Sequence, residues 1–202
     1  MTGIKNNRLF SLLRRFRSET RGIAAIEFAI AVPVLLGIYI LALEFAEAIE
    51  VNKKLGRVAI QVGDLVAQQP KVTPGELDAI MSISGATLEP YRRSAPTITV
   101  TAIEVTNDST PKAVVLWSRR YTDGVAERAE KPGAITEIPQ ALKTPGTFLV
   151  RSEASLGYQP IIAWSPAAKQ GLHLAALDEL DMLGERYYQQ PRVSSIIPCG
   201  DC

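Results

Sequence analysis

Residues 22–43 read GIAAIEFAIAVPVLLGIYILAL, and this run contains a single charged side chain, Glu27. At about 1.5 Å of rise per residue, a helix of this length matches a hydrocarbon core of about 30 Å. A core helix of a water-soluble protein would carry polar side chains along one face, whereas this run is apolar around its circumference apart from Glu27. The stretch therefore predicts one transmembrane helix near the beginning of the chain.

Charge is distributed unevenly on the two sides of this run. The residues before it hold one acid, Glu19, against six basic side chains: Lys5, Arg8, Arg14, Arg15, Arg17 and Arg21. The residues just after it include three acids, Glu44, Glu47 and Glu50. Because basic flanks stay on the cytoplasmic side, the pattern predicts a single-pass protein of a bacterial inner membrane. Its N-terminus would lie in the cytoplasm and its C-terminal domain in the periplasm.

The predicted division is a basic cytoplasmic leader at 1–21, a transmembrane helix at 22–43, a helical extension at 44–69 and a periplasmic domain at 70–202. Two other interpretations of the N-terminus stay open. Ala46-Glu47-Ala48 fits the small-x-small site of a cleavable signal peptide, although the apolar run exceeds the usual h-region of about 7–15 residues. A plain anchor that is never processed is the other.

Glu27 and Pro33 are unusual inside such a run. A carboxylate at the centre of a bilayer costs about 2.5–3.5 kcal/mol on insertion scales, and less within a turn of the interface. Glu27 would either extend to the cytoplasmic headgroups or pair with a positive group inside the membrane. Pro33 removes one backbone donor and predicts a kink, which neighbouring helices can accommodate.

The segment Arg21-Gly22-Ile23-Ala24-Ala25-Ile26-Glu27-Phe28-Ala29, followed by Pro33, resembles the N-terminal signature of the TadE-like (TadE/TadG-like) family of tight-adherence, or Flp (type IVb), pilus assembly proteins. It is also similar to the signature of type IV pilins. Such signatures have a basic leader that ends in Gly, then an apolar helix with Glu at its fifth position and often an aromatic residue at its sixth. Gly22, Glu27 and Phe28 match these positions.

The resemblance implies a prepilin peptidase that cuts between Gly22 and Ile23, although some members of the family keep their leader as an anchor. After a cut, Glu27 could neutralise the new α-amino group of Ile23 on a neighbouring subunit. The resemblance also implies a pilin-like fold and assembly through helix packing, in which Glu27, Phe28 and Pro33 would take part.

Helical periodicity continues beyond the membrane run to Gln69, where Pro70 predicts the end of the helix. Apolar side chains recur there at three- and four-residue steps: Phe45, Ala48, Ile49, Leu55, Ala59, Val62 and Val66. Gly56 and Gly63 lie seven residues apart on one face. They either allow the close approach of another helix or of a sheet, or only weaken the helix.

The remaining chain predicts an α+β domain. Thr73 and Glu76 form a capping box at the start of a helix that continues to about Leu88. Strands are predicted at 97–105, 113–120 and 148–158, the first two as a hairpin, with Leu149 as the one break in the alternation of the third. A short helix is predicted around 132–142. At 172–190 partial helical spacing competes with a returning strand or an irregular arm, so mixed structure is predicted there. The fold class is therefore α+β, a helix-backed antiparallel sheet, which agrees with the pilin-like resemblance.

Two cysteines, Cys199 and Cys202, stand in the sequence Cys-Gly-Asp-Cys. In an exported compartment they predict a disulfide, either as a tight local loop or as bridges to another chain. A redox pair is disfavoured because no helix begins after them to lower a thiol pKa. A zinc site is disfavoured because His173 is the only other soft ligand in the chain.

Enzymatic chemistry is not expected. His173 has no nucleophile motif to serve, and the acids Asp178, Glu179 and Asp181 fit a solvated face. The sequence has no phosphate loop or dinucleotide fingerprint, so we predict no cofactor, no metal and no small-molecule substrate. Nucleic acid is not an expected partner, because the formal net charge is +1 and the basic stretch at 5–17 is interleaved with apolar residues that suit a lipid surface.

These expectations combine into one hypothesis: a non-enzymatic component of tight-adherence pilus assembly, either a minor pseudopilin or a membrane-anchored assembly protein. Its predicted partners are the inner membrane, pilins or other pilus assembly proteins, and a prepilin peptidase. The alternative is a membrane-tethered periplasmic binding or sensing domain unrelated to pili.

Overall fold

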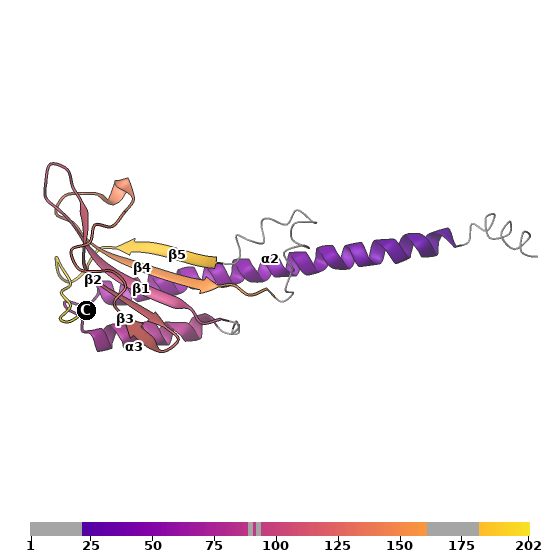
Figure 1. Cartoon of the computed structure of the whole chain (residues 1–202), viewed down its shortest axis with the longest axis horizontal. Coiled ribbons are helices and arrows are strands. Elements are labelled where there is room, and N and C mark those ends of the chain that lie inside the picture. The colour runs from indigo at the N-terminus through magenta and orange to yellow at the C-terminus, as the bar shows by residue number, and fades with distance from the viewer. Residues whose placement is uncertain (1–21, 89–90, 92–93, 161–181) are drawn as a thin grey trace, which may run out of the picture. The chain divides into compact units, whose positions relative to one another are not determined.

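The computed structural model of the chain describes residues 22–88, 91, 94–160 and 182–202. The chain forms two compact units, Met1–Phe45 and Ala46–Cys202. The division falls inside one helix, α2 (Ile23–Ala67), so this helix contributes to both units (Figure 1). The predicted leader at 1–21 lies outside the described residues.

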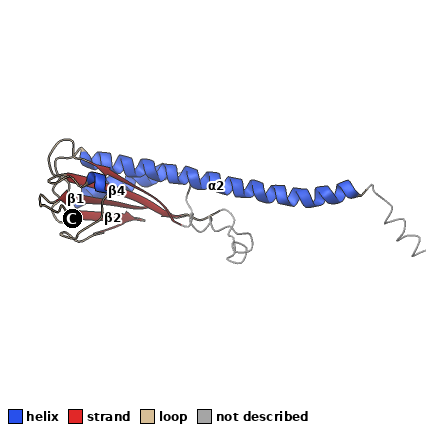
Figure 2. Cartoon of the chain, turned by 90° about the horizontal axis from the view of Figure 1, so that it is seen from above, coloured by secondary structure: helices blue, strands red, loops and turns tan. Residues whose placement is uncertain are grey.

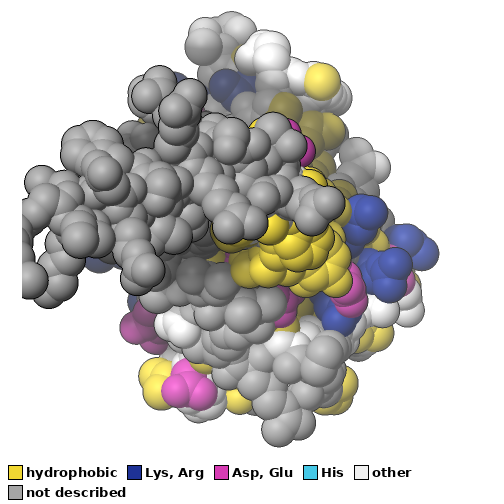
Figure 3. All heavy atoms as spheres, turned by 90° about the vertical axis from the view of Figure 1, so that its right-hand side faces the viewer, with side chains coloured by type: hydrophobic (Ala, Val, Ile, Leu, Met, Phe, Trp, Pro, Cys, Tyr) yellow, Lys and Arg dark blue, Asp and Glu magenta, His cyan; other side chains and the backbone are white. Residues whose placement is uncertain are grey.

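The described part of the first unit is the beginning of α2, and its surface is apolar. The exposed large side chains are Ile23, Ile26, Phe28, Ile30, Val34, Leu35, Leu36, Ile38, Tyr39 and Leu43. Figure 3 looks along the helix from its beginning and shows a patch of hydrophobic side chains there. Pro33 lies within α2 and does not end it. By length and composition, α2 could cross a membrane.

The second half of α2 belongs to the second unit and buries one face. The buried side chains are Ala48, Val51, Leu55, Val58, Ala59, Val62 and Val66. The predicted stripe is confirmed from Ala48 to Val66 except at Ile49, whose side chain is 55% exposed, and its first member, Phe45, is only partly buried. The helix ends at Ala67, two residues before the predicted end at Gln69. The backbone N–H of Arg192 donates to the Ala67 carbonyl at 2.9 Å, which satisfies one of the free carbonyls at the helix end.

The predicted capping box at Thr73 is confirmed. The Glu76 N–H donates to Thr73 Oγ1 at 3.4 Å, and the Thr73 N–H donates to Glu76 Oε2 at 2.9 Å. Helix α3 (Pro74–Ser84) follows, and a 3-10 turn, η1 (Gly85–Leu88), completes the predicted helical stretch.

The sheet has five antiparallel strands in the order β3-β2-β1-β4-β5. Their bounds are β1 Thr97–Val105, β2 Ala113–Thr122, β3 Val125–Glu127, β4 Phe148–Gly157 and β5 Met182–Gln189. The predicted hairpin of β1 and β2 is confirmed, and the predicted third strand is β4. The register between β1 and β2 shifts between Ala102 and Ile103. Strand β1 therefore lies at the centre of the sheet, and β3 and β5 form its edges.

The second half of α2 and α3 cover one face of the sheet, which we call the inner face (Figure 2). The main core lies between these helices and the inner face, and it includes Leu55, Val62, Met81, Val100 and Trp117. A smaller cluster occupies part of the opposite, outer face, where Ile138 packs on Ile103 and Leu149. The fold is therefore α+β, with a helix-backed open antiparallel sheet.

Two predictions need correction. The helix expected around 132–142 is reduced to a single 3-10 turn, η2 (Gln140–Leu142), because much of this segment pairs instead with the start of β2. Thr136 N–H, for example, donates to the Ala113 carbonyl at 3.0 Å. Within the predicted mixed region 172–190, Met182–Gln189 is a regular edge strand, and residues before Met182 lie outside the described part of the chain.

Candidate functional site

Gly22 and Ile23 lie where α2 begins. Ile26 N–H donates to the Gly22 carbonyl at 3.1 Å, so Gly22 closes the first helical turn although it precedes the helix. Apart from its chain neighbours and the backbone of its own helix, no described atom lies within 4 Å of the position that a Cβ on Gly22 would take, and Ile23 is half exposed. The Gly22–Ile23 peptide bond therefore lies on the surface of the described structure.

Glu27, Phe28 and Pro33 lie along the first turns of the same helix. Glu27 shares a shallow groove on the helix surface with Ile30 and Val34. Phe28 is 70% exposed. Glu27 has no hydrogen bond or ion pair with any other described residue, so its carboxylate is available to a partner outside the described structure.

The two glycines of the second half of α2 lie against the sheet. A Cβ on Gly63 would lie 2.6 Å from Ser152 Oγ, and one on Gly56 would lie 3.2 Å from the Tyr187 hydroxyl. Two polar contacts accompany this approach: Asn52 Nδ2 donates to Glu185 Oε1 at 2.7 Å, and Gln189 Nε2 donates to the Ile60 carbonyl at 3.0 Å. Of the alternatives open from the sequence, the sheet is the element that approaches these glycines.

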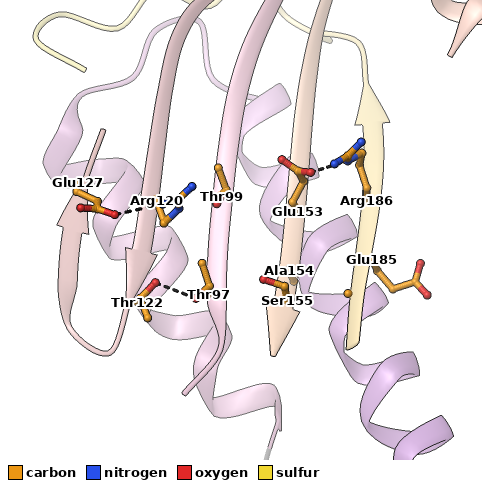
Figure 4. A pocket seen from close by; sticks show the side chains of 11 residues that line it. Thr97, Thr99, Arg120, Thr122, Glu127, Glu153, Ala154, Ser155, Glu185 and Arg186 are labelled. Atoms are coloured by element: carbon orange, nitrogen blue, oxygen red, sulfur yellow. Dashed lines mark hydrogen bonds and ion pairs between the residues drawn. The ribbon is translucent and has the colours of Figure 1, made fainter. Parts of the chain in front are cut away.

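The outer face of the sheet carries an open polar trough (Figure 4). Strand register places its side chains in two rows that cross all five strands. The charge row contains, in order from β3 to β5, Glu127, Arg120, Thr99, Glu153 and Arg186. The hydroxyl row, two residues away along each strand, contains Val125, Thr122, Thr97, Ser155 and Gly184. Most of these residues line about 830 Å³ of open space.

Each side of the trough carries an ion pair. Arg120 pairs with Glu127 at 3.3 Å, and Arg186 pairs with Glu153. Partial burial lowers the pKa of Arg186, but the charge of Glu153 and hydrogen bonds outweigh this effect, so the pKa is raised above its ordinary value. The two acids and two bases of the charge row cancel, so this row offers charged groups without a net charge, although Glu185 adds a third acid to the lining of the trough.

A separate ion pair fastens α3 to the inner face. Arg119 on β2 donates from Nε and Nη2 to the two carboxylate oxygens of Asp78 on α3, each at 2.6 Å. The hydrogen bond that Arg119 donates to Asp78 raises the pKa of Arg119, against the effect of partial burial. A bidentate pair of this kind fixes orientation as well as distance.

Next to the charge row, Arg151 on β4 is buried, with 4% of its surface exposed. Its Nη1 donates to Thr136 Oγ1 at 2.8 Å, its Nη2 pairs with Glu130, and its Nε lies 3.1 Å from Glu153 Oε2. A buried guanidinium is costly without partners, so these contacts hold the 130–136 segment over the sheet.

Sequence reasoning missed this network. Arg151 occupies a polar position in the alternation of β4, and the alternation predicts an exposed side chain. The signal was Leu149, two residues earlier on the same face, which breaks the alternation because Ile138 covers it. That break indicates a covered outer face in this part of the sheet.

The C-terminal segment packs against the core and ends in a disulfide between Cys199 and Cys202. Trp117 Nε1 donates to the Ile197 carbonyl at 2.7 Å, and Cys199 forms a parallel bridge with Val72. Arg128 Nε donates to the Cys202 carbonyl at 2.6 Å. The disulfide is thus the local loop, one of the two arrangements that the sequence left open.

A metal site in the described residues would need side chains grouped to hold an ion. Across residues 22–88, 91, 94–160 and 182–202, no group of three or more His, Cys, Asp or Glu side chains is placed to hold a metal ion. His173 and the acidic cluster of Asp178, Glu179 and Asp181 lie outside these ranges. The groups that the described structure does bring together are charge pairs and hydroxyls.

Comparison of the chain with protein-family models, curated proteins and solved structures gives no match. Two features of the described structure bear on function: the apolar beginning of α2 with its carboxylate, and the polar outer face of the sheet.

Proposed function

We propose that the chain is a non-enzymatic component of a tight-adherence pilus apparatus, either a minor pseudopilin or a membrane-anchored assembly protein. The observation that carries this proposal is Glu27 near the start of a helix whose first half is apolar on its surface. The helix would be inserted in the bacterial inner membrane, with the basic leader in the cytoplasm and the sheet domain in the periplasm.

Glu27 supports assembly because a carboxylate inside a membrane needs a partner. An unpaired carboxylate at the bilayer centre costs about 2.5–3.5 kcal/mol on insertion scales. Glu27 stands four residues after Ile23, so it lies one helical turn from the α-amino group that cleavage after Gly22 would create. A positive group on a neighbouring subunit would remove most of the cost. Pairing of Glu27 would therefore favour contact with a subunit that supplies such a group.

Cells of the native host provide the functional test. A chromosomal Glu27→Gln variant removes the charge and keeps the shape, and we expect surface pili seen by electron microscopy to be lost, as in a deletion strain. Glu50→Gln, on the exposed face of the second half of α2, is the matched control and should leave pili intact. Normal pili in the deletion strain would contradict the proposal.

The N-terminus of the native protein decides between pseudopilin and anchor. Mass spectrometry of protein purified from the host should find Ile23 as the first residue if a prepilin peptidase acts. An N-terminus at Met1 leaves the membrane-anchored form of the proposal, and one at Ile49 would show a cleaved signal peptide and would contradict a membrane helix in the mature protein.

The polar trough favours a second candidate, a membrane-tethered periplasmic binding or sensing domain. Its hydroxyl groups and two ion pairs could hydrogen-bond a polar ligand. This candidate predicts intact pili in the deletion strain. It also predicts that replacing both Thr122 and Ser155 with Val removes two of these hydroxyl groups and weakens binding of the polar ligand.

A further inference from the structure

The charge row of the outer face has an order that is complementary to itself. From β3 to β5 its side chains are acidic, basic, neutral, acidic and basic, with Thr99 of the central strand in the middle. Read in the opposite direction, the order becomes basic, acidic, neutral, basic and acidic. Every charge therefore meets its opposite when the row faces a reversed copy of itself.

We propose that this face is an interface between two copies of the chain, related by a two-fold axis that runs along β1 between the two facing sheets. A two-fold axis produces an isologous contact, in which the same patch serves both partners. It places Arg120 opposite Glu153 of the second copy and Glu127 opposite its Arg186, and each pair occurs twice. Thr99 faces its own copy on the axis.

The hydroxyl row fits the same symmetry. Val125 on β3, which is 64% exposed, would face Gly184 on β5 of the second copy, a residue that carries no side chain of its own. Thr122 would face Ser155, and Thr97 would face itself. Two rows thus agree on one axis, although only one of them carries charge.

The direction of the axis is also fixed by the row. An axis across the strands would place each side chain of the charge row opposite its own copy, so like charges would meet. An axis along the strands avoids this.

Side chains near Gly56 come from Glu185 and Tyr187, and those near Gly63 include Gln189, so α2 runs in the same direction as β5 within the sheet domain. Both copies of Ala46 then lie at the same end of the dimer, as two chains inserted in one membrane require.

The free part of the face is small. Five strands about 4.8 Å apart and about four residues of strand length, at about 3.3 Å each, give roughly 300 Å² per copy. A standard interface buries about 800 Å² per partner. The cluster around Ile138 covers the outer face further along β1 and prevents a larger contact. We therefore expect a weak dimer that forms where a shared membrane raises the effective concentration.

Exchanging the charges of one ion pair within the chain tests the interface with little change to the fold. The double variant Arg120→Glu/Glu127→Arg keeps an ion pair between β2 and β3 and the net charge, yet it places like charges opposite each other at four positions of the dimer. The matched control, Arg120→Lys/Glu127→Asp, keeps every sign.

The measurement is energy transfer between dye-labelled full-length chains in liposomes at low protein density. We expect the wild type and the sign-keeping control to transfer energy, the signal to fall at 1 M salt because exposed pairs are screened, and the charge swap to lower the dimer fraction at least fivefold. No transfer in the wild type, or equal transfer in the swapped variant with a folded circular dichroism spectrum, overturns the proposal.

Cross-linking on the axis provides a second measurement. Thr97→Cys should give a dimer with a short bis-maleimide reagent, because Thr97 faces its own copy, whereas Ile83→Cys on α3 should not. Equal cross-linking by both variants would place the contact elsewhere, for example along α2. Both measurements use purified protein without pilus components, so their failure is distinct from failure of the proposed role in pili.

Discussion

The two halves of α2 are one continuous helix with opposite surfaces. The first half exposes its large apolar side chains, whereas the second half buries its apolar stripe against a sheet and exposes residues such as Lys53 and Arg57. Glycines show the contrast most directly: a Cβ on Gly37 would meet nothing within 4 Å, and one on Gly63 would meet Ser152 Oγ at 2.6 Å. A helix can therefore be continuous while its environment changes along its length. The environment is indicated by how far apolar side chains extend around the helix: all around it in the first half, and along one stripe in the second.

The largest expected difference between the halves comes from removing a leucine side chain. Leu55 is fully buried in the core, so Leu55→Ala should lower the free energy of unfolding of the sheet domain by about 3 kcal/mol through lost burial and a cavity. Leu35 is 63% exposed, and Leu35→Ala should leave that free energy unchanged. Chemical denaturation of the full chain in detergent, followed by near-ultraviolet circular dichroism, measures both. Equal losses would mean that the halves do not differ in packing.

A glycine-to-valine pair should give the next largest difference. Gly63→Val forces side-chain atoms into Ser152 and Gln189, and we expect a loss of about 2 kcal/mol from overpacking. Gly37→Val adds the same atoms where no neighbour lies within 4 Å and should not affect the sheet domain. The same denaturation experiment applies. A harmless Gly63→Val would show that α2 does not approach the sheet as closely as described.

Local sequence was sufficient for the elements that depend on local chemistry. The capping box at Thr73 is satisfied within four residues, and the strand predicted at 97–105 has the observed bounds of β1. Strand β5 was harder, because Gly184 and its charged neighbours have little intrinsic strand preference and the segment gains its structure by pairing with β4. Such pairing between distant segments leaves no periodic signal.

The candidate functional residues show the same difference between local and long-range information. Gly22, Glu27 and Phe28 are neighbours in the sequence, so a linear pattern can point to them. The charge row draws one residue from each of five strands, and its order depends on the register of four strand pairs. No spacing in the sequence predicts that Arg120 and Glu153 lie on the same row, and the polar trough could be found only from the fold.

A smaller effect is expected for the polar contact between the second half of α2 and the edge strand. Asn52 donates to Glu185 at 2.7 Å in a partly buried position, and Asn52→Ala should cost about 1.5 kcal/mol because a hydrogen bond to a charged group is lost. The first half of α2 offers Tyr39 as a comparison, since its side chain is exposed and Tyr39→Phe should be silent. A loss below the error of the denaturation experiment for Asn52→Ala would show that packing alone positions β5 on the helix.

The smallest effect belongs to the exposed face of the second half. Glu50 lies 3.1 Å from Lys54 in an i,i+4 pair, but its side chain is 67% exposed, so water and salt screen the attraction. Glu50→Gln should cost about 0.3 kcal/mol at low ionic strength and nothing measurable in 1 M salt. Denaturation curves at the two salt concentrations give the difference directly. A loss above 1 kcal/mol that persists in high salt would mean that Glu50 is not on a solvated face, and the contrast between the two halves of α2 would then rest on packing at the buried stripe alone.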